Sequence, residues 1–144
     1  MAEQGLVNEW LAVFGRDVDK KIMNRHVIAS GNYLWHIFTW GNVACLKGEE
    51  AKRAFDSLSY VRAIKFYDGR NSRIKNVSLV GKVSAKELDE NAGRDVYLVA
   101  EDFSWTYVRT HEELCGPYLC FKGKPRTIPN IPLGGWKNDN YKIH

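Results

Sequence analysis

The chain has 144 residues, of which 44% are hydrophobic, 26% charged and 12% aromatic. This composition is close to that of an average soluble globular domain, and it excludes a disordered chain. No apolar run approaches the roughly 20 residues that cross a bilayer, and the N-terminus lacks a signal-peptide pattern. The sequence carries no phosphate-binding glycine loop, nucleophile elbow or metal-ligand cluster, so we expect no cofactor, no metal and no membrane association.

The net charge of +4 comes from the C-terminal end of the chain. Acidic and basic residues balance over residues 1–121, whereas residues 122–144 carry five Lys/Arg residues against Asp139. Three of the four prolines also lie there. We therefore predict one folded domain over residues 1–121 and a basic Gly/Pro-containing extension over 122–144. The cations of the extension are too widely spaced to define a nucleic-acid patch by themselves.

The three cysteines, Cys45, Cys115 and Cys120, point to a cytoplasmic protein. An odd number of cysteines without a secretory signal is typical of free thiols in a reducing compartment. The spacing of Cys115 and Cys120 does not match the cysteine pairs that bind zinc. We therefore expect each cysteine to be a small buried side chain with a free thiol.

Three helices are predicted from apolar spacing and capping signals. Leu6, Trp10 and Phe14 recur on one helical face over residues 3–14. A second apolar stripe runs through residues 48–58, and the two glutamates in its first turn complement the helix dipole. Ser84 and Glu87 have the spacing of a capping box, so a short helix should begin there and end near residue 91.

Strands are predicted around these helices. Residues 33–40 are almost wholly apolar and aromatic, which indicates a central strand buried on both faces. Residues 61–67 alternate as a strand does, residues 96–100 and 105–111 are typical of a hairpin, and residues 117–121 can add a third antiparallel strand. Residues 70–83 show no clear pattern. The predicted fold class is α+β, with a mixed or mostly antiparallel sheet and helices packed on it in a single domain.

The second arm of the hairpin carries the main candidate site. A period of two places Trp105, Tyr107, Arg109 and His111 on one face of the strand, and Glu112 follows them. An imidazole transfers protons near neutral pH, and a guanidinium holds a carboxylate or a phosphate. This face would suit anion binding or acid–base catalysis. The alternative is an ordinary half-exposed sheet face with cross-strand pairs.

His36 and Trp136 are candidates outside this arm. His36 lies inside the aromatic run, where it is either a core histidine or, if it faces His111, one half of an acid–base pair. Trp136 lies among Gly, Pro and Lys residues, so it either anchors the extension or contacts a partner, as Arg109 would. The aromatic residues within the predicted strands fit core positions better than stacking on bases or sugars.

Several segments together resemble a known family. They are residues 34–38, 45–55 and 95–112, of which the last ends in Thr110-His111-Glu112, and the later step Gly116-Pro117-Tyr118. Over roughly residues 30–121 the chain is similar to a family of small uncharacterised bacterial proteins, a domain of unknown function. The resemblance implies a bacterial or phage source and a single cytoplasmic domain. It implies no activity, so it assigns no catalytic residue.

Three functions are compatible with the sequence. We favour a non-enzymatic protein-binding module, for example an immunity or regulatory protein, whose partner is another protein. The second hypothesis is a small hydrolase or phosphodiester-cleaving enzyme that uses His111, Arg109 and Tyr107, with His36 and Glu112 as further candidates. The third is a nucleic-acid binder that acts through the basic extension.

Overall fold

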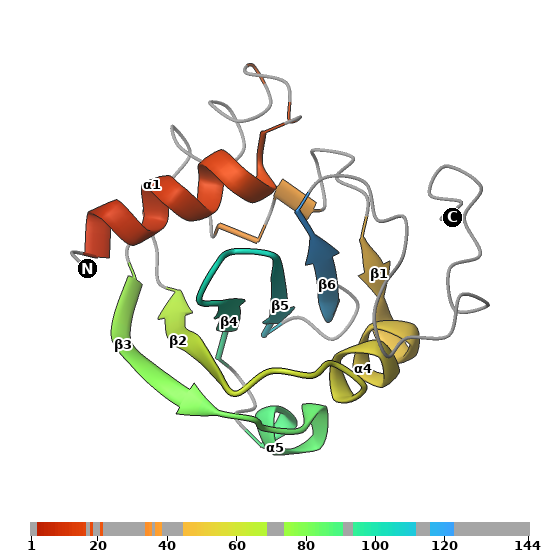
Figure 1. Cartoon of the computed structure of the whole chain (residues 1–144). Helices are drawn as coiled ribbons and strands as arrows, with labels where there is room; N and C mark the ends of the chain where they lie inside the picture. The colour runs from red at the N-terminus through yellow and green to blue at the C-terminus, as the bar shows by residue number, and fades with distance from the viewer. Residues whose placement is uncertain are drawn as a thin grey trace.

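The computed structural model describes residues 3–16, 18, 21, 34, 35, 37, 38, 45–68, 74–90, 94–111 and 116–122. In this part the chain forms an antiparallel six-stranded sheet with helices packed on it (Figure 1). The predicted α+β fold class is confirmed. The predictions for His36, Glu112, Trp136 and the extension from residue 123 onward fall outside the described residues.

The strand order in the sheet is β1-β6-β5-β4-β2-β3. The strands are β1 (Leu46–Lys47), β2 (Arg62–Asp68), β3 (Ile74–Gly81), β4 (Val96–Ala100), β5 (Trp105–Arg109) and β6 (Tyr118–Phe121). The helices are α1 (Glu3–Phe14), α4 (Gly48–Asp56) and α5 (Ala85–Asp89). All three helices begin close to where the sequence predicts them, and Ser84 and Glu87 form the predicted capping box.

The β4–β5 hairpin is the buried centre of the sheet. Every residue of β4 is buried, and β5 is buried up to its last residue, Arg109. The two strands join through a turn in which the Asp102 carboxylate accepts a hydrogen bond from the Ser104 backbone N–H at 3.0 Å. β6 pairs with β5, so the predicted hairpin and the predicted third antiparallel strand are both confirmed.

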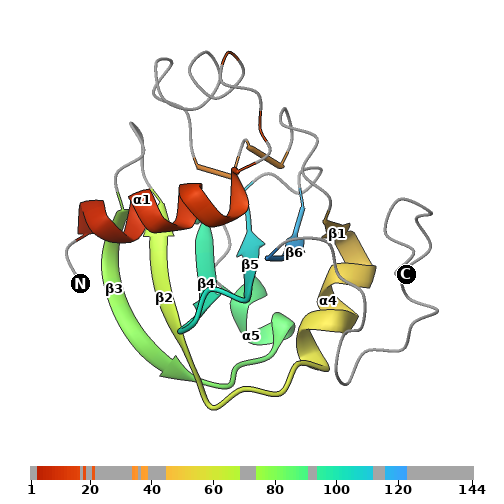
Figure 2. The same cartoon turned by 45° about the horizontal axis from the view of Figure 1, so that its top comes forward.

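The two faces of the sheet carry separate hydrophobic cores. Figure 2 shows α1 lying across one face, with α4 and α5 on the other side. Leu98 and Tyr107 pack with α4 and α5, whereas Tyr97 and Val108, their neighbours along the strands, pack with α1. This alternation follows from the period of two, and it explains why the central strands are apolar on both faces.

Helix α1 is fixed to the sheet through Trp10. The indole is fully buried, and its Nε1–H donates a hydrogen bond to Thr106 Oγ1 at 3.0 Å. The Trp10 ring lies edge-on to Phe38 and Tyr97, with centroid distances of 5.5 and 5.4 Å. The apolar face of α1 that the residue spacing predicts is therefore confirmed, and it packs against the sheet.

The predicted central strand at residues 33–40 is wrong. Its described members, Leu34, Trp35, Ile37 and Phe38, lie in turns and a helical segment and not in the sheet. The Ile37 and Phe38 N–H groups donate to the carbonyls three residues earlier, at 3.2 and 2.9 Å. All four side chains are buried in the core beneath α1. A short, wholly apolar run indicates burial, but it does not distinguish a strand from a helical turn.

Side chains of the sheet hold this segment in place. The Leu34 N–H donates to Asp68 Oδ2 at 2.7 Å, and the Trp35 N–H donates to the Tyr97 hydroxyl at 2.9 Å. The Tyr97 hydroxyl in turn donates to Asp68 Oδ2. The buried Asp68 and Tyr97 side chains thus accept the hydrogen bonds of two backbone N–H groups, which in a strand would be donated to a neighbouring strand.

The predicted free thiols are also wrong for two of the three cysteines. Cys45 and Cys120 form a disulfide across a Cα–Cα distance of 4.6 Å. The register of β1 and β6 pairs Leu46 with Leu119, so it brings the residues just before and just after them face to face. The 75-residue separation of the two cysteines hides this pairing from any reading of the sequence. Cys115 lies outside the described residues.

Strand β3 lies within residues 70–83, where the sequence shows no clear pattern. It pairs with β2 on one side only and forms one edge of the sheet. Lys65 stands opposite Ser78 and Tyr67 opposite Lys75, so Asn76 and Val77 both face Phe66 in a β-bulge. Asn76 takes the left-handed conformation there, with φ of 57°. A mostly exposed edge strand with a bulge lacks the apolar alternation that identifies the other strands.

Candidate functional site

A pocket of about 480 Å³ opens at the end of β5, where Arg109 leaves the sheet. The first turn of α4, the end of α5 and the step into β6 form its other walls. Its size is in the range of pockets that bind small molecules. The residues that line it are Gly48, Glu49, Lys52, Asp89, Arg109, Thr110, Gly116 and Pro117.

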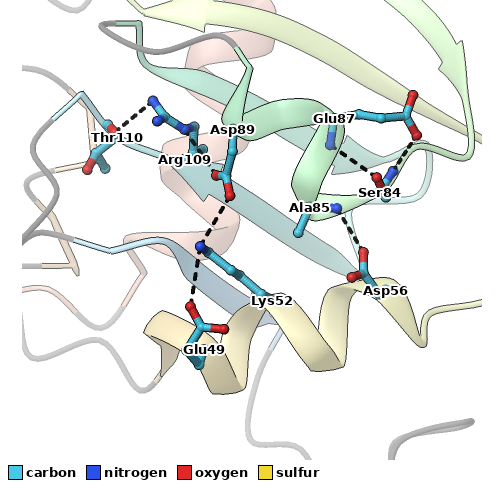
Figure 3. A network of polar contacts seen from close by, with 9 residues as sticks. All are labelled: Glu49, Lys52, Asp56, Ser84, Ala85, Glu87, Asp89, Arg109 and Thr110. Atoms are coloured by element: carbon cyan, nitrogen blue, oxygen red, sulfur yellow. Dashed lines mark hydrogen bonds and ion pairs between the residues drawn. The ribbon is translucent and has the colours of Figure 1, made fainter.

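Asp89 joins the two cations of this pocket. Its Oδ1 lies 3.3 Å from Arg109 Nε, and its Oδ2 lies 3.2 Å from Lys52 Nζ (Figure 3). Lys52 also lies 3.4 Å from Glu49 Oε2, and Arg109 Nη1 donates to the Thr110 carbonyl at 3.3 Å. The Asp89 carboxylate raises the pKa of the Lys52 ammonium. The pocket is therefore charged but electrically balanced.

Gly116 and Pro117, joined by a cis peptide bond, form another part of the pocket wall. Gly116 has φ of +94°, and a Cβ there would come within 3.1 Å of the Tyr118 ring, so this position needs glycine. The Gly48 N–H donates to the Pro117 carbonyl at 2.9 Å and fixes the start of α4 beside β6. The position that precedes α4, Lys47, gives the helix no side-chain cap.

Tyr107 lies on the same face of β5 as Arg109, two residues earlier. Its ring is fully buried and stacks on Phe55 of α4, with centroids 4.0 Å apart. Its hydroxyl has no hydrogen-bond partner in the described structure. Burial raises the pKa of Tyr107, and the nearby carboxylates of Asp89, Asp56 and Glu49 raise it further.

His111 lies apart from Tyr107 and Arg109, so the predicted common face is wrong for this residue. β5 ends at Arg109, and the His111 ring meets Trp35, which belongs to the core beneath α1. Asp95 Oδ1 lies 2.7 Å from both the His111 backbone N and its Nδ1. The buried Asp95 carboxylate thus binds both the backbone and the ring of His111, and holds the ring on the α1 side of the sheet. The other three residues, Trp105, Tyr107 and Arg109, share the predicted face.

A second feature lies at the opposite edge of the sheet. The large apolar side chains that are exposed in the described residues are Val61, Val77 and Leu79, with exposed fractions of 84, 37 and 53%. Val61 immediately precedes β2, and the other two belong to β3. Leu79 stands opposite Ile64, and Val77 lies two residues earlier along the same strand, so both point to the α1 side.

Cations gather on the other face of the same edge. Lys65 Nζ and the Arg94 guanidinium lie 5.4 and 4.8 Å from the centroid of the Tyr67 ring. Lys75 stands opposite Tyr67 in the ladder and is exposed. No carboxylate of the described residues pairs with these three cations. We call Lys65, Lys75 and Arg94 the β3 cation cluster.

The described residues add two negative findings. They contain no group of three or more His, Cys, Asp or Glu side chains arranged to hold a metal ion. None of the helices they form combines the length and apolarity that a membrane crossing needs.

The fold and these features define a small α+β domain with a charged pocket beside β5 and an exposed edge strand, β3. A family model described as "Domain of unknown function (DUF4275)" matches residues 6–119, and the chain belongs to this family. No curated protein and no solved structure matches the chain. The family assignment confirms the resemblance seen in the sequence and leaves the function to be inferred from the structure.

Proposed function

We propose that the chain is a non-enzymatic protein-binding module, of the kind that immunity and regulatory proteins represent, and that it binds an extended segment of its partner along β3. One observation carries this proposal. Two of the three exposed large apolar side chains of the described residues, Val77 and Leu79, belong to β3, and no other described strand pairs with its outer side. Exposed apolar residues that gather in one place are typical of interaction surfaces.

Strand addition fits the backbone of this edge. β3 has eight residues, and an edge strand presents unpaired N–H and C=O groups that a partner strand can bond. The bulge at Asn76 interrupts the pairing with β2 and adds twist to the strand. A partner segment as long as β3 would therefore pair with its regular part, residues 77–81, and continue past the bulge to Lys75.

The side chains at this edge define the chemistry of the partner. Val77 and Leu79 point to one face, and the β3 cation cluster lies on the other. A strand that pairs with β3 alternates in the same way, so apolar residues would meet Val77 and Leu79 while acidic residues would meet Lys75 and its neighbours. We infer a partner segment that alternates acidic and apolar residues.

The proposal is tested with a fluorescent peptide of about eight residues, the length of β3, that alternates glutamate and valine. Fluorescence anisotropy should show saturable binding to the whole chain. A peptide with lysine in place of glutamate should bind at least roughly tenfold more weakly, because its charges are repelled by the β3 cation cluster.

Two variants make this test specific. Lys75→Glu should weaken binding of the acidic peptide roughly tenfold, whereas Lys47→Glu should not, since Lys47 is an exposed lysine on β1 at the far edge of the sheet. Equal effects of the two substitutions would overturn the proposal. Dimerisation of the chain through β3, or tighter binding of a single-stranded oligonucleotide than of the peptide, would also overturn it.

The other hypotheses have less support. An enzyme that combines Tyr107, Arg109 and His111 would need them together, and they lie on different sides of the sheet. Of the residues proposed for catalysis, His111 keeps one feature of an acid–base site, since the Asp95 carboxylate contacts its Nδ1 and orients the ring. A cytoplasmic location stays a prediction, and the oxidation state of Cys45 and Cys120 in cells tests it, because disulfides rarely persist in a reducing cytoplasm.

A further inference from the structure

The charged pocket at the end of β5 lies toward the opposite edge of the sheet from β3, and the proposed protein binding does not use it. We propose that this pocket is a binding site for a small zwitterion, that is, a free amino acid or a compound with the same pair of carboxylate and ammonium groups. Four groups carry the inference: the cations Lys52 and Arg109, the carboxylate of Asp89, and the buried hydroxyl of Tyr107.

The pocket contains positive and negative side chains whose ion pairs have long N–O distances. The contacts of Asp89 with Lys52 and Arg109 measure 3.2 and 3.3 Å, and that of Lys52 with Glu49 measures 3.4 Å. Well-formed charge-assisted hydrogen bonds are shorter, at about 2.7–2.9 Å. These groups are also only partly shielded, because the side chains of Lys52, Asp89 and Arg109 are 28, 36 and 15% exposed. A ligand with both charges can exchange with these pairs and keep every charge compensated.

Donors remain for the carboxylate of such a ligand. Arg109 uses Nε for Asp89 and Nη1 for the Thr110 carbonyl, and Nη2 has no bond in the described structure. A guanidinium presents five N–H donors in a planar fork that matches a carboxylate. The first turn of α4 opens on the same pocket through Gly48 and Glu49. The Gly48 N–H is bonded to the Pro117 carbonyl, but the helix has no side-chain cap, so the N–H groups after Gly48 add a weaker attraction for a carboxylate.

Tyr107 supplies an independent observation. Its hydroxyl is buried and has no hydrogen-bond partner in the described structure, which is costly in a well-packed interior. It extends from the face of β5 that carries Arg109, two residues before this pocket-lining arginine. Tyr107 itself does not line the pocket, so a bound ligand would satisfy this hydroxyl through a water molecule and account for a tyrosine where phenylalanine would pack equally well.

The charge balance selects the zwitterion over simpler ligands. A phosphate would meet Lys52 and Arg109 but would be repelled by Asp89 and Glu49. A simple amine would meet the two carboxylates but would be repelled by the two cations. Only a ligand with both groups gains from both sets, and like-charge contacts in a site of this kind are strongly unfavourable.

The inference is tested by calorimetry and thermal unfolding of the whole chain. The probes are the free proteinogenic amino acids, with acetate, ethylamine and inorganic phosphate as single-charge controls. At least one amino acid should bind at least roughly tenfold more tightly than any single-charge probe. At a concentration of about 100 times its Kd it should raise Tm by roughly 5–10 °C. Absence of binding by every amino acid, or equal affinity for phosphate, would overturn the inference.

Matched variants separate a ligand site from a structural ion pair. Arg109→Gln should weaken amino-acid binding about tenfold or more, the effect of losing a charged hydrogen bond. Arg62→Gln is the control, because Arg62 also forms an ion pair, outside this pocket, with its Nη2 3.4 Å from Glu101 Oε2. Tyr107→Phe should weaken binding roughly three- to tenfold without lowering the stability of the unliganded chain. If Arg109→Gln unfolds the chain, Tyr107→Phe decides alone, and unchanged affinity in that variant would overturn the inference.

Discussion

Tyr97→Phe tests how the buried polar contacts beneath α1 stabilise the fold. The Tyr97 hydroxyl donates to Asp68 Oδ2 and accepts from the Trp35 N–H at 2.9 Å, and all three groups are buried. The substitution keeps the aromatic ring, which stacks on Phe66 with centroids 4.8 Å apart. Only the hydroxyl is lost, so the effect reports on its two hydrogen bonds.

The expected loss follows from the kind of bond removed. A hydrogen bond to a charged carboxylate contributes about 1.5–3 kcal/mol, and a buried N–H left without an acceptor costs about 1–3 kcal/mol. Asp68 Oδ2 keeps its bond from the Leu34 N–H, which limits the damage. We therefore expect the free energy of unfolding to fall by about 2–4 kcal/mol, and Tm to fall by roughly 5–15 °C for a domain of this size.

Urea unfolding at neutral pH, followed by tryptophan fluorescence, measures this change. Tyr107→Phe is the matched control, since Tyr107 is equally buried but its hydroxyl has no partner in the described structure. We expect that control to leave stability unchanged or to raise it by up to about 1 kcal/mol. If the two variants lose the same free energy, the Tyr97 contacts do not stabilise the fold as described, and our explanation for residues 34–38 fails.

Three further predictions concern pH, the disulfide and the extension. Burial, reinforced by Asp68 and Asp89 respectively, raises the pKa of Tyr97 and Tyr107, so the fold favours their neutral forms. Stability should hold below pH 10, where unfolded tyrosine is also neutral, and fall as the pH rises further; flat stability up to pH 11 would contradict this. Cys45→Ser, measured by urea unfolding against the oxidised parent, should cost about 2–4 kcal/mol, because the disulfide closes a loop of 75 residues. Removal of residues 123–144 should lower the isoelectric point and leave the thermal transition of the domain in place, whereas loss of that transition would make the extension part of the core.

Local patterns in the sequence predicted most of the elements correctly. The apolar face of α1, the Ser84–Glu87 capping box and the β4–β5 hairpin each depend on residues close together in the chain. These elements can be predicted because the helix and strand periods appear directly in the order of the side chains. The family resemblance can be recognised for the same reason, since it depends on the same local motifs.

The errors arose where distant residues decide the structure. Residues 34–38 are held by Asp68 and Tyr97, which lie far along the chain, and Cys45 meets Cys120 only because β1 pairs with β6. The candidate site shows the same limit. The sequence identified Arg109 and Tyr107, but nothing near them in the chain indicates that Lys52 of α4 and Asp89 of α5 complete the pocket. His111 was misplaced because Asp95 captures it beyond the end of β5.

Amide hydrogen exchange along β3 tests the proposed protein binding most directly. The whole chain is measured alone and at saturation with the peptide that alternates glutamate and valine. Strand addition predicts that amides within residues 77–81 that face away from β2 exchange at least roughly tenfold more slowly in the complex, while those of β1 at the far edge do not change. Unchanged exchange along β3 in a saturated complex would contradict it, because the peptide would then be bound elsewhere.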